Sequence, residues 1–191
     1  MDLLFYINSI LLGAGLAADA FSVSLANGLN EPHMKKSKTL GIAGVFGIFQ
    51  TVMPMIGWFL VTKLIEAFKT FEKFIPYIAL ILLLYIGGKM LIEGIKNEES
   101  DQKAALSFTD LLIQGIATSI DALSVGFTIA NYGFGEALIE TIIIGVTTFI
   151  ICVCGLQIGK KFGTKFANKA GILGGVILIA IGIEIFIKGV F

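Results

Sequence analysis

Two aspartates stand in the middle of apolar stretches, where ionisable side chains are rare. Asp19 and Asp121 each begin the pattern Asp-Ala-x-Ser-Val, and a glycine, Gly13 or Gly115, precedes each of them by six residues. An acid at the centre of a membrane helix costs roughly 2.5 to 3.5 kcal/mol on insertion scales, so such residues usually have a function. Two acids at matching places in the two halves of one chain predict a shared ion site.

Hydroxyl side chains accompany both acids. Residues three apart in a helix share a face, so we expect Ser22 to lie beside Asp19. For the same reason we expect Ser124 and Thr118 to lie on either side of Asp121. These hydroxyls are candidate metal ligands, although a serine in a membrane helix more often bonds its own backbone or a neighbouring helix.

A third apolar stretch adds Gln50 in mid-span, followed by Pro54, which can free a backbone carbonyl of the preceding turn. The donor set then consists of oxygen atoms, with two carboxylates and with no His or Cys at ligand spacing. Such a set suits a hard or borderline divalent cation such as Mn²⁺, Mg²⁺ or Ca²⁺. Two carboxylates also balance the charge of one dication.

Other readings of the charged and thiol residues stay open. Each aspartate could instead be neutral and hydrogen-bonded, or could pair with Lys89 and hold the helices together. Lys89 and Glu93 are four residues apart, a spacing that favours an ion pair with a coupling or gating role, or two side chains that reach the cytoplasmic interface. Cys152 and Cys154 point to opposite sides of a helix, so they cannot chelate together.

Composition decides the class of the protein that positions these residues. The chain of 191 residues is 56% hydrophobic and 15% charged, and its mean hydropathy is +0.91, which predicts an all-α integral membrane protein in a lipid bilayer. A spanning helix needs about 20 apolar residues. Six such runs fit, at roughly 3–29, 40–62, 74–95, 106–131, 137–159 and 171–191. The connections are too short to form a soluble catalytic or nucleic-acid-binding domain, and the formal net charge of zero gives no sign of a nucleic-acid partner.

The two halves are predicted to be inverted repeats within one transporter domain, residues 1–97 and 104–191. Each half holds three spans, and an odd number of crossings reverses the second copy in the membrane. The third and sixth spans share a pattern in which Lys89 matches Glu184, and the second and fifth spans align only at Gly57 and Gly155.

Orientation follows from the basic residues, all of which are lysines. Most of them lie in the connections after the first, third and fifth spans, and cytoplasmic loops are enriched in such residues. We therefore expect a multi-pass protein with both termini outside. Glycine runs such as Gly41, Gly44 and Gly47 predict close approach between helix backbones.

Five ordered motifs resemble the MntP family of manganese efflux pumps, which is related to the lysine exporter superfamily. They are Asp19-Ala20-Phe21, Phe46-Gly47-x-x-Gln50-x-x-x-Pro54-x-Ile56-Gly57-Trp58, Gly87-Gly88-Lys89-Met90-Leu91-Ile92-Glu93-Gly94, Ala117-Thr118-Ser119-Ile120-Asp121-Ala122 and Ile172-Leu173-Gly174-Gly175. The resemblance implies a bacterial inner-membrane exporter of Mn²⁺, with Asp19 and Asp121 as its central acids, and with Mn²⁺ as transported substrate rather than cofactor. Members more often carry Ala at the positions of Ser22 and Ser124, and some carry Glu at the position of Gln50.

Rival functions remain at this point. The same fold could export Ca²⁺, Cd²⁺ or an amino acid, but an amino acid needs a partner for its carboxylate, and Lys89 is the only candidate. An intramembrane aspartyl protease also uses two aspartates, but neither acid here stands in a Gly-x-Gly-Asp signature. We therefore expect a transporter and not an enzyme. The chain has no P-loop, so proton antiport is the expected energy source, and the oligomeric state stays open.

Overall fold

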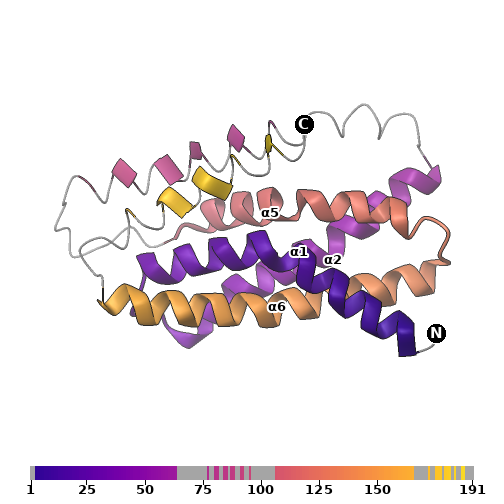
Figure 1. The fold of residues 1–191 in the computed structure, drawn as a ribbon, viewed down its shortest axis with the longest axis horizontal. Helices are drawn as coiled ribbons and strands as arrows, with labels where there is room; N and C mark the ends of the chain where they lie inside the picture. The colour runs from indigo at the N-terminus through magenta and orange to yellow at the C-terminus, as the bar shows by residue number, and fades with distance from the viewer. Residues whose placement is uncertain are drawn as a thin grey trace.

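The computed structural model describes residues 3–63 and 106–165, together with single residues between 77 and 95 and between 172 and 187. The described chain is helical and contains no strand. Its four complete helices (Figure 1) are α1 (Leu3–Asn30), α2 (Lys36–Lys63), α5 (Phe108–Thr128) and α6 (Phe134–Lys165). All four are long and apolar enough to cross a membrane, which confirms the all-α membrane class for this part of the chain.

Helices α2 and α6 extend well beyond their predicted apolar runs, whereas α5 (Phe108–Thr128) lies within the predicted run 106–131. Helix α2 begins at Lys36 instead of about residue 40, and α6 spans Phe134–Lys165 instead of 137–159. A helix of 32 residues is about 48 Å long, more than the roughly 30 Å of the hydrocarbon core. Hydropathy marks the part of a helix that lies in lipid, whereas polar residues continue the same backbone hydrogen bonding at the membrane surface.

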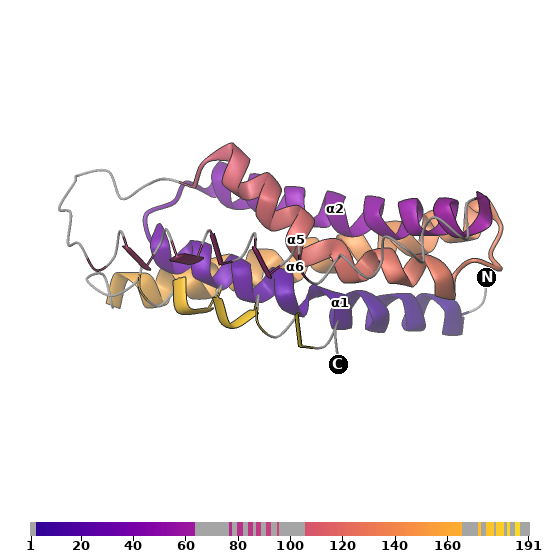
Figure 2. The same ribbon diagram turned by 90° about the horizontal axis from the view of Figure 1, so that it is seen from above.

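The closest contacts between the helices involve glycines, and these contacts show the relative directions of the helices. Gly13 packs against Ile144 and Thr147, and Gly28 packs against Gly159 further along both helices, so α1 and α6 run parallel. Figures 1 and 2 show α2 and α5 running in the opposite direction beside them. Helix α1 packs mainly on α6, whereas α2 packs on both α5 and α6.

The glycines Gly41, Gly44 and Gly47 of α2 differ in how closely a neighbouring helix approaches them. A Cβ added at Gly47 would meet the carbonyl oxygen of Gly145 at 2.9 Å, so these two backbones do approach closely. At Gly41 and Gly44 an added Cβ meets no atom of the described residues within 4 Å. The prediction of close approach is therefore correct for Gly47, whereas Gly41 and Gly44 lie on faces of α2 that no described helix contacts this closely.

Described residues of the two remaining segments also touch each other. Gly175 lies against Gly87 and Leu91, and the rings of Tyr77 and Phe186 meet edge to face with centroids 5.1 Å apart. The later residue of one segment meets the earlier residue of the other, so these segments run antiparallel.

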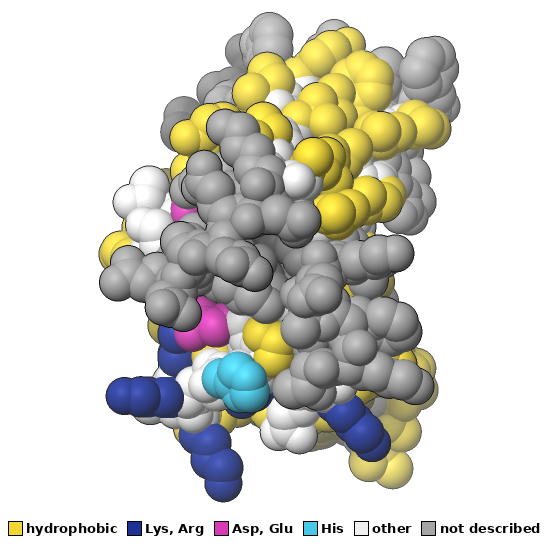
Figure 3. All heavy atoms as spheres, turned by 90° about the vertical axis from the view of Figure 1, so that its left-hand side faces the viewer, with side chains coloured by type: hydrophobic (Ala, Val, Ile, Leu, Met, Phe, Trp, Pro, Cys, Tyr) yellow, Lys and Arg dark blue, Asp and Glu magenta, His cyan; other side chains and the backbone are white. Residues whose placement is uncertain are grey.

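The two ends of the bundle differ in their side chains. At the end where α1 stops and α2 begins, lysines gather on the surface seen in Figure 3; those described are Lys35, Lys36, Lys38, Lys160 and Lys161. At the opposite end, Trp58 donates from Nε1 to the carbonyl oxygen of Tyr132 at 3.2 Å and packs against Phe134. Between the ends, large apolar side chains such as Leu11 and Ile48 are exposed, as expected of surfaces that face lipid.

Candidate cation site between α1, α2 and α5

A single amide joins three helices at the centre of the bundle. Gln50 of α2 is fully buried, and its Nε2 donates to the carbonyl oxygens of Leu16 in α1, at 3.3 Å, and of Thr118 in α5, at 3.1 Å. Leu16 and Thr118 each lie three residues before the aspartate of their half. The amide therefore bridges two equivalent carbonyls, one beside each acid.

The two aspartates lie at nearly the same depth. Asn27 of α1 and Gln114 of α5 form a buried amide pair, with Nδ2 to Oε1 at 2.7 Å and Nε2 to Oδ1 at 3.3 Å. Asp19 is eight residues from Asn27, and Asp121 is seven residues from Gln114, on helices that run in opposite directions. At 1.5 Å per residue, Asp19 lies about 12 Å and Asp121 about 10.5 Å from the amide pair, measured along the bundle. Both lie on the same side of the pair, so their depths are nearly equal.

The carboxylates are less buried than the amide that lies near them. Asp19 is half-buried and Asp121 is exposed, and Oδ1 of Asp121 accepts a hydrogen bond from the backbone N–H of Ala122 at 2.8 Å. Among the described residues, no group of three or more His, Cys, Asp or Glu side chains could hold a metal ion. Any cation held by this pair would therefore take its other ligands from neutral oxygens.

The predicted hydroxyl ligands differ in burial. Ser22 is half-buried and donates to the carbonyl oxygen of Ala18 at 3.0 Å, and Ser124 is also half-buried. Thr118 is buried and donates to the carbonyl oxygen of Gln114 at 2.9 Å. Ser22 and Thr118 thus bond their own helices, which leaves the lone pairs of their oxygens as the part that could face a cation. Lys89 and Glu93 lie outside the described residues, so their predicted pairing stays a prediction.

Two buried oxygens at this level have no donor among the described residues, Oε1 of Gln50 and Oγ1 of Thr148. They occupy equivalent places, because Gln50 lies seven residues before Gly57 and Thr148 seven before Gly155. Pro54 lies inside α2 and has no N–H, so the carbonyl of Gln50 also lacks its helical donor. A buried acceptor without a donor costs about 1–3 kcal/mol, and a cation or a water molecule would remove that cost.

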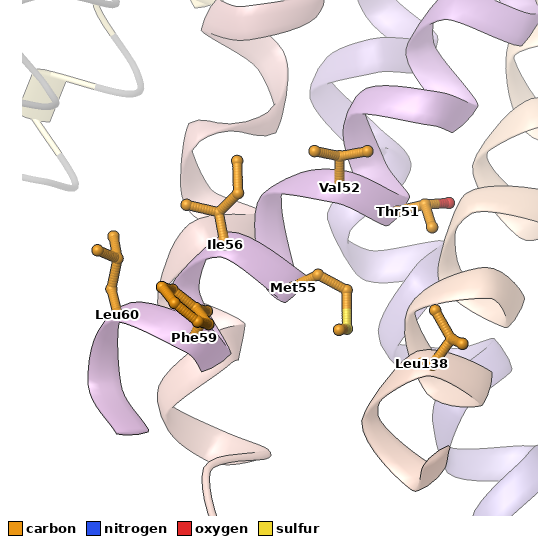
Figure 4. A pocket seen from close by; sticks show the side chains of 7 residues that line it. All are labelled: Thr51, Val52, Met55, Ile56, Phe59, Leu60 and Leu138. Carbon is orange, nitrogen blue, oxygen red and sulfur yellow. The ribbon is translucent and has the colours of Figure 1, made fainter. Parts of the chain in front are cut away.

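A pocket lined by described residues lies elsewhere. It is a groove of about 330 Å³ between α2 and the start of α6 (Figure 4), lined by Thr51, Val52, Met55, Ile56, Phe59, Leu60 and Leu138. The hydroxyl of Thr51 is bonded to the carbonyl oxygen of Gly47 at 3.0 Å. With only apolar side chains besides, the groove offers no ligands for a cation.

Three polar residues within the helices were missed by the sequence reasoning. Asn27 and Gln114 carry no charge, so nothing in the sequence separates them from other polar residues in membrane helices. Glu140 is an acid in the apolar part of α6 and is 6% exposed, and the rule that selected Asp19 and Asp121 also applies to it. It has no equivalent in the other half of the chain, so a search for repeated acids passes over it.

The chain was compared with known proteins. A family model described as "Putative manganese efflux pump" matches residues 33–186. A "Putative manganese efflux pump MntP" of Rippkaea orientalis is 44% identical over 190 residues, which cover 99% of this chain and 98% of the relative. Proteins of the same name from Clostridium perfringens (strain SM101) and Methanosarcina mazei are 41% and 39% identical, over 94% of this chain and 92% and 95% of theirs.

No solved structure matches the chain. The family match covers most of the sequence, the relatives match over nearly their full length, and the four complete helices are long and apolar enough to cross a membrane. The chain is therefore a multi-pass membrane protein that belongs to the MntP family.

Proposed function

We propose that the protein exports Mn²⁺ from the cytoplasm across the bacterial inner membrane in exchange for protons, through a midplane site built on Asp19 and Asp121. The relatives are named as manganese efflux pumps. The observation that carries the proposal is the bridge from Gln50 to the carbonyl oxygens of Leu16 and Thr118. It brings the helices that bear the two acids together at one depth, in the interior of an apolar bundle.

The proposed ligand set is made of oxygen atoms. The carboxylates of Asp19 and Asp121 neutralise the dication, and Oε1 of Gln50, which has no described partner, is oriented by the two hydrogen bonds of its own amide nitrogen. The hydroxyl oxygens of Ser22, Ser124 and Thr118 are further ligands in this proposal. An oxygen set favours Mn²⁺ over softer cations such as Cd²⁺, which prefer thiolate.

Contacts that recur in the two halves support the proposed inverted repeat. Gly57 packs against Leu123 and Gly126, which follow Asp121 by two and five residues. Gly155 packs against Phe21 and Ser24, which follow Asp19 by the same two intervals.

The crossing of α2 and α6 fits the same symmetry. Gly47 and Gly145 lie ten residues before Gly57 and Gly155, and they contact each other. A two-fold axis of the repeat would pass between them. Alternating access then consists of one half rocking against the other about a fixed site, with Lys89 and Glu93 as the proposed gating pair.

The proposed orientation puts the lysine-bearing end in the cytoplasm and both termini outside. All five described lysines with described side chains lie at that end. Aromatic side chains at the other end are typical of a membrane interface.

The test uses purified protein in liposomes that contain a Mn²⁺ indicator, together with cellular manganese content in a strain without its own exporters. Wild type should transport Mn²⁺ and lower cellular manganese. Asp19→Asn and Asp121→Asn should each lower transport at least about tenfold, since Asn keeps the shape but removes the charge that holds the dication. Glu136→Gln, which removes an exposed acid at the start of α6, is the matched control.

Competition identifies the cargo. Excess Mg²⁺ should compete weakly, because Mg²⁺ demands near-ideal octahedral geometry and dehydrates reluctantly. Transport of Cd²⁺, Ca²⁺ or an amino acid with none of Mn²⁺ would overturn the proposed substrate. Normal transport by either aspartate variant would remove that residue from the site.

A further inference from the structure

Two halves related by inversion present the same chemistry to both sides of the membrane. Where residues at equivalent positions differ, the two sides of the membrane meet different chemistry. Several buried residues break the symmetry between the halves, and the role inferred for them rests on the proposed function.

Glu140 is the buried acid that the proposed cation site does not use. It is 6% exposed, and its Oε2 has no hydrogen-bond partner among the described residues. Ala137 and Ile144, on the same face of α6, belong to a buried apolar cluster in this half of the bundle. The other members of the cluster are Leu12, Leu16, Met55, Trp58, Val125 and Ile129. The carboxyl group of Glu140 therefore extends from the face of α6 that forms this cluster.

Ser9 of α1 lies at the level of Glu140. Gly13 contacts Ile144, and because α1 and α6 run parallel, one turn further outward brings Ser9 to Glu140. Ser9 is fully buried, and its Oγ donates to the carbonyl oxygen of Phe5 at 2.8 Å. Two buried polar residues thus face the α1–α6 interface in the part of the bundle between its centre and the end with Trp58 and Phe134. We call this part the aromatic half, and the part towards the lysines the lysine-bearing half.

The equivalent positions in the other half are apolar. Leu111 precedes Asp121 by the ten residues that separate Ser9 from Asp19, and Ile42 precedes Gly57 by the fifteen that separate Glu140 from Gly155. Both are buried in the apolar cluster of the lysine-bearing half.

The lysine-bearing half has a different polar pair. Asn27 and Gln114 bond each other there, whereas the equivalent residues of the aromatic half are Ile129 and Leu12, which are apolar. Amides do not ionise and cannot carry a proton. The lysine-bearing half thus contains a pair of neutral amides, whereas the aromatic half contains a carboxyl group.

The surroundings of Glu140 decide which cation it suits. A divalent cation needs about six oxygen ligands. Apart from the carboxylate, the described side-chain oxygens nearby belong to Ser9, to the exposed Glu136 one turn earlier in α6, and to Thr141, whose hydroxyl donates to the carbonyl oxygen of Leu138 at 3.0 Å. A proton needs one lone pair. It also neutralises the carboxylate, which removes the penalty for a charge among apolar side chains.

We propose that Glu140 is the proton-binding residue through which the outer side supplies the protons exchanged for Mn²⁺. A proton from outer water bonds to a carboxylate oxygen of Glu140 and forms the neutral acid. Water in the outward-open path carries the proton over the roughly 15 Å that ten residues of α1 span, to Asp19 or Asp121 after Mn²⁺ has left them, and Glu140 is then a carboxylate again. Two such protons, one for each aspartate, complete the exchange for one Mn²⁺. No electron transfer is involved, and each proton that enters balances one positive charge that leaves.

Few other titratable groups face this region. Among the described residues they are Tyr6 on α1, Tyr132 after α5 and Glu136 at the start of α6, all exposed, with Asp19 and Asp121 at mid-depth. Between Gln50 and Thr62, α2 has none. None of the lysines whose side chains the structure describes lies in this half.

The experiment separates proton coupling from metal transport. Two rates are measured in liposomes: Mn²⁺ transport driven by an imposed pH gradient, and exchange of Mn²⁺ for Mn²⁺ at equal pH on both sides. Wild type should show both. Glu140→Gln, which imitates the protonated acid, should lose at least about tenfold of the gradient-driven rate, while metal exchange stays within about twofold. Glu140→Asp should keep part of the coupling, and Glu136→Gln should behave as wild type.

If wild type neither transports nor exchanges Mn²⁺, the proposed function fails and not the role of Glu140 alone. If wild type is driven by the gradient and Glu140→Gln is driven equally well, the proposal for Glu140 is overturned. Loss of both rates in Glu140→Gln, in protein whose thermal unfolding matches wild type, also overturns it, because that result puts Glu140 in the metal path or in the transport cycle itself.

Discussion

Gln50 is a side chain for which the structure supports two roles. Its amide nitrogen holds α1 and α5 through the carbonyl oxygens of Leu16 and Thr118, and its amide oxygen has no described donor. An amide whose nitrogen is held by hydrogen bonds and whose oxygen is available is a good cation ligand, because little side-chain conformational entropy is lost when the ion binds.

Replacing Gln50 with Leu should lower the stability of the protein. Both interhelical hydrogen bonds are lost, and each such bond inside a membrane contributes about 0.6 kcal/mol on average and up to about 1.7. We therefore expect a loss of about 1 to 2 kcal/mol, measured by denaturant or thermal unfolding in detergent. Thr148→Val is the matched control, because the hydroxyl that it removes is buried and has no hydrogen-bond partner among the described residues. A loss of similar size in the control would mean that the effect belongs to polar burial in general.

At the scale of the helices, glycines determine how closely the backbones can pack. A Cβ at Gly57 would overlap the carbonyl oxygen of Leu123, and one at Gly28 would overlap that of Leu156. Both obstacles are backbone atoms of a neighbouring helix, so a rotamer change cannot relieve them.

Gly57→Ala should therefore push α2 away from α5 and cost about 1 to 3 kcal/mol of stability, as overpacking of a core does. Gly44→Ala is the matched control within the same helix, because its Cβ meets no described atom within 4 Å. Alanine is also the better helix former by roughly 0.5 to 1 kcal/mol, so the control should be neutral or slightly stabilising. Thermal unfolding of both variants tests this, and equal destabilisation would contradict the contact assigned to Gly57.

The amide pair of Asn27 and Gln114 connects α1 to α5 in the lysine-bearing half, and under the proposed alternating access these helices separate when that side opens. Asn27→Cys together with Gln114→Cys, in a background with Cys152 and Cys154 replaced by Ala, should be cross-linked by a short bifunctional thiosulfonate. Two side chains that meet end to end place their Cα atoms too far apart for a direct disulfide. The cross-link should stop Mn²⁺ transport, and a reductant should restore it.

The equivalent cross-link in the other half is the control for this result. Leu12→Cys and Ile129→Cys occupy the same places in the repeat. Under alternating access each cross-link should stop transport and leave the site reachable from the opposite side only. Full transport with either cross-link in place would exclude movement of α1 against α5.

For the whole molecule, the distribution of side chains predicts how it lies in the membrane. From the lysines at one end and the aromatic residues at the other, we expect the connection 31–35 in the cytoplasm and the connection 129–133 outside. A cysteine at Gly133 should then react with a membrane-impermeant maleimide in intact cells. A cysteine at His33 should react only after the membrane is opened. The reverse pattern would invert the topology and, with it, the proposed direction of export.

Several properties could be predicted without the structure. Hydropathy identified four spans that the structure describes as helices, and the anchors Asp19 with Asp121 and Gly57 with Gly155 relate positions whose contacts recur. Both kinds of signal can be read along a single chain, because lipid requires long apolar helices and a repeat preserves intervals between residues.

Tertiary structure alone decided which side chains meet. Gln50 is 34 residues from Leu16 and 68 from Thr118, Asn27 is 87 residues from Gln114, and only their packing reveals these partners. Of the glycines in α2, Gly47 contacts α6 closely and Gly44 does not. In a soluble helix the apolar face indicates which way the helix is turned. A membrane helix is apolar towards lipid as well as towards its neighbours, so its rotation about its own axis, and therefore every contact of the site, depends on the packing of the whole bundle.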